Sequence, residues 1–245
     1  MSTGPILRAA IAAVGSRLAD DWLAPSCALC GLSPAQSAAE TAGLCSGCAA
    51  RLPGASEARC SVCAEAVQGE ARRCARCARL PAPFDGTLTL GSYAPPLDRW
   101  ITALKFGRDP GLARPLGELL AARLQSAGLS APDLLVPVPL GSARLRARGF
   151  NQALEIARPI GRALGRAPQL GLLRRRRETA PQSSLTQAAR IDNLERAFDC
   201  TRPLAGARVA VVDDVMTTGA TLSAVAQALK RAGAGHVLNL VACRA

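Results

Sequence analysis

The stretch VVDDVMTTGATL, residues 211–222, sets two adjacent carboxylates between an apolar run and a loop of small and hydroxyl residues. The run Val209–Val212 predicts a buried strand, and Ala220–Ala232 predicts a helix. Asp213 and Asp214 then fall at the carboxyl end of the strand, which is where ligands bind in open α/β sheets. The order of strand, acidic pair, loop and helix therefore predicts one unit of an α/β fold.

The loop after the acidic pair is typical of an anion site. Thr217, Thr218 and Gly219, followed by Ala220 and Thr221, place backbone NH groups and hydroxyls at the start of the next helix. A loop that holds a phosphate leaves the carboxylates to face paired sugar hydroxyls or a divalent cation such as Mg²⁺. A phosphorylated ribose meets all of these demands. The weaker alternative is an ordinary strand and capped helix with solvated carboxylates.

Outward from this stretch, apolar runs alternate with helical patterns. This alternation predicts an α/β domain with a mostly parallel sheet and helices on its faces. The predicted strands are Thr87–Tyr93, Leu134–Val138, Val209–Val212 and Val237–Ala242, and the predicted helices are Leu97–Phe106, Pro115–Gly128, Asn151–Leu164 and Ala220–Ala232.

Eight of the ten cysteines fall in four C-x2-C pairs before residue 80. Two such pairs supply the four thiolates of a tetrahedral zinc site, so eight cysteines predict two structural Zn²⁺ sites. Disulfides and redox C-x-x-C chemistry are weaker interpretations. Neighbouring pairs sharing an ion give Cys27, Cys30, Cys45 and Cys48 for one site and Cys60, Cys63, Cys74 and Cys77 for the other, with a cross-braced pairing left open.

The remaining organisation follows from spacing and composition. Residues 1–24 predict an amphipathic helix, residues 25–80 a double zinc-ribbon module and residues 81–245 the α/β domain. The start of the chain makes a poor signal peptide, and no apolar run approaches the roughly 20 residues that a membrane span needs. We therefore expect a cytoplasmic protein.

The formal net charge of +12, from 30 basic and 18 acidic residues, favours a polyanionic partner. Aromatic residues make up only 3% of the chain, so we expect binding of nucleic acid to be mainly electrostatic and steeply salt-dependent. Candidate contacts to a pyrophosphate or to nucleic acid are Lys105, Arg144, Arg148, Arg174, Arg175, Arg176 and Arg177. The four consecutive arginines among them, 174–177, predict a mobile loop that binds phosphate groups.

At residues 211–222 the sequence resembles the phosphoribosyltransferase family. The resemblance implies that Asp213 and Asp214 contact the ribose hydroxyls of phosphoribosyl pyrophosphate, and that Thr217 to Thr221 wrap its 5′-phosphate. It also implies a type I phosphoribosyltransferase sheet.

A wider resemblance spans nearly the whole chain. It rests on the paired cysteines and then on Tyr93, Leu104–Phe106, Val136–Leu140, Arg148–Gln152, Glu178–Gln182 and Arg190–Phe198. In this order they resemble the ComF (competence protein F, GntX-like) family, which is associated with DNA uptake in natural transformation. The chain departs from that pattern at Gly141, where histidine is common, so any role of that histidine does not transfer.

Two functions remain open at this point. In the first, the zinc module and the basic loop bind single-stranded DNA during its import, and the phosphoribosyl site holds a phosphoribosyl pyrophosphate-like ligand or a strand-end phosphate. Proteins of the uptake machinery are further partners in this hypothesis. In the second, it is an enzyme that transfers 5-phosphoribose to an unknown base. The sequence offers no acceptor-binding signature, so catalytic residues are not assigned.

Overall fold

Four parallel strands form the sheet of the larger part of the molecule. The computed structural model describes residues 27, 30, 44–52, 57–107, 109–176 and 197–245. The strands are β1 (Gly86–Ser92), β2 (Leu134–Pro137), β5 (Arg208–Met216) and β6 (His236–Arg244), and their spatial order is β1-β6-β5-β2. All three neighbouring pairs are parallel, so the four carboxyl ends meet at one edge of the sheet.

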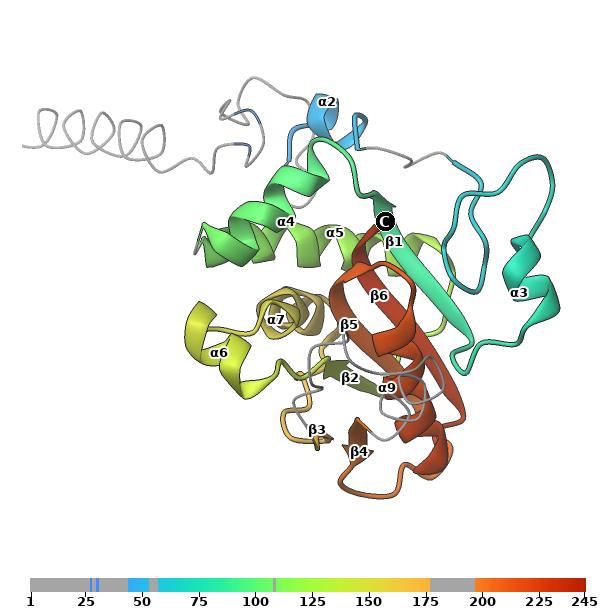
Figure 1. Cartoon of the computed structure of the whole chain (residues 1–245). Helices are drawn as coiled ribbons and strands as arrows, with labels where there is room; N and C mark the ends of the chain where they lie inside the picture. Colours follow the sequence, from blue (N-terminus) through green and yellow to red (C-terminus); the bar gives the residue numbers. More distant parts are fainter. Residues whose placement is uncertain (1–26, 28–29, 31–43, 53–56, 108, 177–196) are drawn as a thin grey trace, which may run out of the picture. The chain divides into compact units, whose positions relative to one another are not determined.

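Helices cover both faces of this sheet (Figure 1). They are α4 (Leu97–Phe106), α5 (Ala113–Ser126), which follows the short 3-10 helix η2 (Pro110–Leu112), α7 (Gln152–Leu164) and α9 (Ala220–Arg231). The valines at 209, 211, 237 and 241 pack with buried side chains of α9, because alternate residues of a strand face opposite sides. Helices α5 and α7 pack closely together, and a Cβ added at Gly117 would lie 2.3 Å from the Pro159 Cγ atom. The predicted α/β fold is confirmed.

Several segments differ from the predictions. Strand β5 continues through both carboxylates to Met216, because its outer half still pairs with β6 as far as Arg244. An additional helix, α6 (Ser142–Arg148), follows β2. A short antiparallel pair forms from β3 (Leu173–Arg175) and β4 (Phe198–Cys200). The predicted mobile loop is therefore wrong for the first two of its four arginines, which lie in a paired strand.

The chain divides into two compact units, Met1–Ala50 and Arg51–Ala245. The first contains the four-residue helix α2 (Ser46–Ala49). The second contains α3 (Ala75–Arg79) together with the sheet. The helix expected at residues 1–24 lies outside the described residues. Among the residues that are described, no helix has the length and apolar character needed to cross a membrane.

Candidate functional site

The two carboxylates of β5 lie near the edge of the sheet where the parallel strands end. Each accepts a hydrogen bond from the next backbone NH, Asp213 Oδ1 from Asp214 at 2.9 Å and Asp214 Oδ1 from Val215 at 2.9 Å. Burial and the neighbouring Asp214 carboxylate raise the pKa of Asp213 well above its ordinary value. The pair is therefore unequal, with Asp213 the carboxyl that holds a proton more readily.

Asp214 has a cationic partner from a different element. Lys105, in the last turn of α4, places its Nζ atom 2.8 Å from Asp214 Oδ2. The two side chains are 24% and 13% exposed, so the pair is shielded only in part from water. The contact joins the helix after β1 to the end of β5, which brings the predicted pyrophosphate-binding lysine and the predicted ribose-binding carboxylate together.

The loop after β5 has the open backbone that an anion site needs. Thr217, Thr218, Ala220 and Thr221 are exposed, and Gly219 caps helix α9 with a φ of 80°. A Cβ at this glycine would lie 2.6 Å from the flexible end of Met216, its Cε atom, which can shift, so a larger residue there is opposed mainly by the positive φ. The NH of Ala220 lies 3.3 Å from the Thr218 hydroxyl, whose oxygen accepts its hydrogen bond. The loop thus presents threonine hydroxyls and the first turn of a 12-residue helix to solvent, with the Ala220 NH already bound to the Thr218 hydroxyl.

A basic cavity of about 240 Å³ adjoins the Lys105–Asp214 pair. It is lined by Lys105, Phe106, Arg144, Ala147 and Arg148. The Arg148 guanidinium lies 5.5 Å from the centre of the Phe106 ring, which is itself 73% exposed. Three of the predicted phosphate contacts therefore lie around one cavity, and helix α6 is the element that brings two of them there. Phe106 adds an exposed ring for stacking, and its apolar character at a helix end hid that role in the sequence.

The remaining predicted cations lie on the β3–β4 pair. Arg174 is exposed, whereas the Arg175 guanidinium lies 5.6 Å from the centre of the Phe198 ring. Arg176 forms an ion pair with Asp199. These contacts hold Arg175 and Arg176 to their own strand pair. Arg177 lies outside the described residues, as do 178–196, which contain most of the two later ComF-like motifs.

The cysteines form two groups with the geometry of zinc sites. The first cysteine group is Cys27, Cys30, Cys45 and Cys48, and the second cysteine group is Cys60, Cys63, Cys74 and Cys77. Within each group all four Sγ atoms lie within 4.8 Å of one another, and those of Cys30 and Cys45 and of Cys63 and Cys74 lie 3.8 and 3.6 Å apart. Tetrahedral zinc with bonds of about 2.3 Å requires about 3.8 Å between sulfurs. Sequential pairing is confirmed, and the cross-braced pairing is wrong.

Burial opposes the thiolate form at one cysteine of each group, whereas hydrogen bonds from backbone NH groups lower the pKa of Cys60 to about 7 against the effect of burial. Burial, with hydrogen bonds to the neighbouring cysteines, raises the pKa of the Cys48 thiol to about 12. It also raises the pKa of the Cys77 thiol. Four thiolates held this close repel one another and are stabilised by a metal ion, which reverses the effect of burial. Both groups therefore fit structural zinc.

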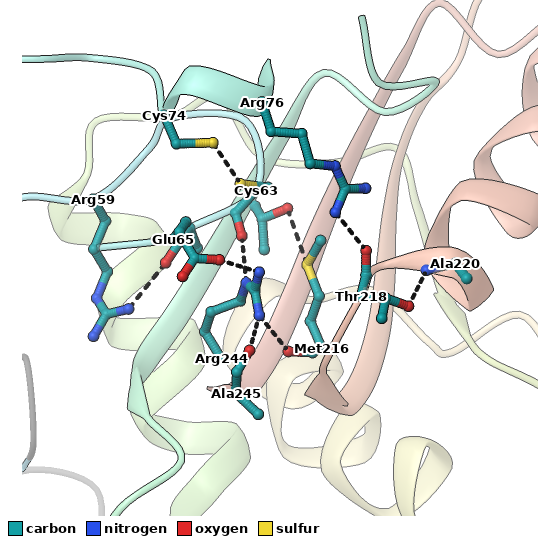
Figure 2. A network of polar contacts seen from close by, with 12 residues as sticks. Arg59, Cys63, Glu65, Cys74, Arg76, Met216, Thr218, Ala220, Arg244 and Ala245 are labelled. Carbon is teal, nitrogen blue, oxygen red and sulfur yellow. Dashed lines mark hydrogen bonds and ion pairs between the residues drawn. The ribbon is translucent and has the colours of Figure 1, made fainter. Parts of the chain in front are cut away.

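The second cysteine group is connected to the phosphate loop by two arginines (Figure 2). Arg76, between the last two cysteines, donates from Nη1 to the Thr218 carbonyl oxygen at 3.2 Å. Arg244, at the end of β6, donates from Nε to the Cys63 carbonyl at 3.1 Å and from Nη1 to the Met216 carbonyl at 3.3 Å, and it pairs with Glu65. Neither arginine was among the predicted site residues. Nothing in a C-x2-C pattern indicates what an intervening residue such as Arg76 contacts, and nothing in the apolar run of the last strand indicates a partner for Arg244.

Comparison with known proteins agrees with this geometry. Residues 110–244 match the family model described as a phosphoribosyl transferase domain. The chain is 36% identical over 203 residues to the DNA utilization protein YhgH of Salmonella typhimurium, covering 76% of this chain and 89% of that protein. It is 31% identical over 202 residues to competence protein F of Haemophilus influenzae, covering 80% and 87%.

Among solved structures, the purine phosphoribosyltransferase of Pyrococcus horikoshii is 20% identical and covers 65% of this chain and 87% of its own. Its TM-score of 0.33 is too low to support any conclusion about this protein. The family match and the two relatives are sufficient without it. With its phosphoribosyl transferase domain, its two four-cysteine groups and relatives at 36% and 31% identity over most of its length, the chain belongs to the ComF family.

Proposed function

We propose that the protein works in DNA uptake or utilization, binding single-stranded DNA and a phosphoribosyl pyrophosphate-like ligand in the cytoplasm. The single observation that carries the proposal is the Lys105–Asp214 pair, which stands between the exposed phosphate loop and the basic cavity of Lys105, Arg144 and Arg148. The relatives are named for DNA utilization and competence, which favours DNA as the polyanion. Proteins of the uptake machinery are the further partners that this role implies.

Each part of the site suits a different group of the ligand, according to its charge. The NH groups and hydroxyls of the loop suit the 5′-phosphate, and the carboxylates suit the ribose hydroxyls or a Mg²⁺ ion that accompanies the ligand. The cations of the basic cavity suit the pyrophosphate or a DNA phosphate, and arginine offers two donors to each such group. Zinc has a structural role in this scheme and is not itself a ligand of the phosphates.

Calorimetry of phosphoribosyl pyrophosphate with Mg²⁺ tests the small-ligand site. We expect Asp214→Asn to weaken binding by about 10- to 100-fold, the size of one or two lost charged hydrogen bonds, without unfolding the protein. Asp213→Asn should weaken binding less, because a carboxyl with a raised pKa already resembles the neutral amide. Glu118→Gln is the matched control, since that carboxylate pairs with Arg114 on α5. Unchanged affinity in Asp214→Asn would remove the ribose assignment.

Labelled single-stranded DNA titrated against salt tests the nucleic-acid site. If the three cations of the basic cavity each neutralise one phosphate, a fourfold rise in salt should weaken binding by about 20-fold. Substitution of Arg144 and Arg148 by Gln should flatten that dependence, and phosphoribosyl pyrophosphate should compete with the DNA. An affinity that barely changes with salt contradicts the proposal.

The second candidate is a phosphoribosyltransferase that acts on an unknown base. It is favoured by the position of Lys105, Arg144 and Arg148, because cations there would stabilise the charge that develops on a leaving pyrophosphate. Release of pyrophosphate that depends on an added nucleobase would support the enzyme. Binding of the ligand without any such release, over a panel of bases, would support the DNA-handling role alone.

A further inference from the structure

Two adjoining cavities lie along helix α6 and are lined by its three arginines. The basic cavity of about 240 Å³ is lined by Arg144 and Arg148, and a second basic cavity, of about 350 Å³, is lined by Arg146 and Phe150. Arg148 belongs to both linings, so the two cavities meet at the end of the helix. Residues four apart share a face of a helix, whereas residues two apart do not. Helix α6 therefore directs Arg144 and Arg148 to one side and Arg146 to the other.

The three arginines keep their charge available for a ligand. Among the described residues none of them pairs with a carboxylate, and no acidic residue lines either cavity. Arg144 and Arg146 are exposed, on a helix that has no buried residue. Lys105 adds a fourth cation, which is paired with Asp214. The two cavities therefore offer several cations to the phosphates of one polyanion.

Phe106 places an exposed aromatic ring against these cations. The residue is 73% exposed, and the Arg148 guanidinium lies 5.5 Å from the centre of its ring. Of the other described aromatic residues, only Tyr93 is exposed as well. A cation–π contact holds the ring and the guanidinium together. The large exposed fraction leaves ring surface for another planar group.

The surroundings of Phe106 indicate which planar group this is. Single apolar side chains are often exposed, so exposure alone indicates no ligand. Phe106, however, lines a cavity whose other lining residues are Lys105, two arginines and one alanine. Cations that bind the phosphates of a nucleic acid bring its bases to the same place, and stacking on aromatic side chains holds the bases of single strands. A base inside a duplex is covered by its neighbours, so the ring suits an unpaired base.

We propose that Phe106 stacks on one base of a DNA single strand, while Arg144, Arg146 and Arg148 bind neighbouring phosphates of the same strand. This inference deepens the proposed function and rests on its DNA binding. It adds a contribution from the bases to binding that the composition predicts to be mainly electrostatic, and it assigns that contribution to one side chain. Because stacking does not read the edges of a base, the four bases should bind with similar affinity.

Two oligonucleotides of the same length and charge test the stacking. The first is oligodeoxythymidylate, and the second carries an abasic sugar at every position. For the zinc-loaded full chain at one salt concentration, we expect the first to bind at least about 5-fold more tightly, because one stacked base is worth a factor of about 5 to 150 in affinity. Equal binding of the two by the wild-type protein would overturn this inference but not the proposed function. Binding of neither would overturn both.

Substitutions at Phe106 separate the ring from the charges. Phe106→Leu should bring the affinity for oligodeoxythymidylate to within about twofold of that for the abasic strand, and the exposed position should leave zinc content and folding unchanged. Phe106→Trp keeps a ring and should keep the preference. Arg146→Gln removes a charge and no ring, so it should weaken both oligonucleotides by the same factor. A preference that persists in Phe106→Leu would overturn the proposal.

Tyr93→Leu is the matched control for the loss of an exposed ring. Tyr93 is 42% exposed, and its hydroxyl oxygen lies 3.4 Å from that of Thr102 on α4. It lines neither basic cavity, so this variant should keep the wild-type preference for bases. A loss of preference as large as that in Phe106→Leu would show that an exposed ring acts without neighbouring cations, and it would overturn the assignment to Phe106.

Discussion

The two cysteine groups share one spacing and one ligand geometry, yet their surroundings differ. The first cysteine group belongs to the unit Met1–Ala50, and the second belongs to the unit that holds the sheet. Three of the four cysteines of the second group, Cys60, Cys63 and Cys77, are part of the hydrophobic core that includes Phe84 and Val241. A zinc-ligand pattern therefore predicts the metal and its geometry, but not whether the metal stabilises only its own segment.

The difference extends to the phosphate loop. Arg76 and Arg244 connect the second cysteine group to the backbone of Thr218 and Met216 (Figure 2). Both acceptors flank Thr217 in the loop that we propose holds the 5′-phosphate. The second cysteine group is thus held to this loop by both arginines. Three substitutions test the comparison in turn: at a cysteine of this group, at the buried arginine and at the exposed arginine.

The largest effect is expected from Cys77→Ser. Loss of one buried ligand should release the second zinc ion, and apparent binding free energies of about 10–16 kcal/mol for structural zinc exceed the whole stability of many domains. We expect zinc content to fall from two ions to one by metal analysis, with the main unfolding transition lost or shifted down by more than about 10 °C. Cys200→Ser is the control, because Cys200 lies outside both groups. An unchanged unfolding transition in Cys77→Ser would show that the second zinc ion does not stabilise the hydrophobic core.

A smaller loss of stability is expected from Arg244→Met, which keeps the apolar stem and removes the donors. The Cys63 and Met216 carbonyls then lose their hydrogen bonds from the guanidinium in a region where Arg244 itself is only 9% exposed. At about 1–3 kcal/mol for each of the two buried acceptors, urea unfolding should show a loss of about 2–6 kcal/mol in the free energy of unfolding. Arg114→Met, at an exposed pair on α5, should change the free energy of unfolding by less than about 0.5 kcal/mol. Equal effects of the two substitutions would contradict a supporting role for Arg244.

Arg76→Ala should affect ligand binding more than stability. The bond from Arg76 to the Thr218 carbonyl is exposed, so its loss should cost about 0.5–1 kcal/mol of ligand-binding free energy and weaken the binding of phosphoribosyl pyrophosphate by about two- to fivefold. The melting temperature should shift by less than about 2 °C. Arg79→Ala is the matched control, since the Arg79 side chain donates within its own helix, to the Ala75 carbonyl. If both variants bind the ligand equally well, Arg76 does not position the loop.

Regular periodicity made most of the larger domain predictable. The helix expected at Leu97–Phe106 has the same bounds in the structure, and the last two strands of the sheet extend beyond their predicted bounds at both ends. These elements carry their pattern in their own residues, as apolar runs in strands and a 3.6-residue repeat in helices. The order of strand, carboxylates, loop and helix at residues 211–222 was sufficient to place both carboxylates near a strand end and the loop at the start of α9.

The features that the sequence did not predict depend on contacts between residues that are far apart along the chain. Strand β3 is a strand only because Leu173 pairs with Cys200, and its arginines alone are typical of a solvated loop. Arg76 and Thr218 are 142 residues apart in the chain, and no local pattern indicates that they meet. A cavity of about 560 Å³ at the amino ends of the strands is likewise formed by β1, α5 and the loop from Arg59 to Ala64. None of these three segments has a sequence pattern that predicts a cavity.

The smallest effect on the larger domain is expected from Cys48→Ser, which repeats the Cys77 substitution at the equivalent position of the first cysteine group. Zinc content should again fall to one ion, but the main unfolding transition should stay within about 2 °C and the affinity for phosphoribosyl pyrophosphate within about twofold, because the first group lies in the other unit. Single-stranded DNA binding by the same variant then sharpens the comparison. A loss of DNA affinity without a loss of the small ligand would assign DNA contact to the first zinc ribbon and ligand support to the second, whereas a loss of both would contradict the division between the two groups.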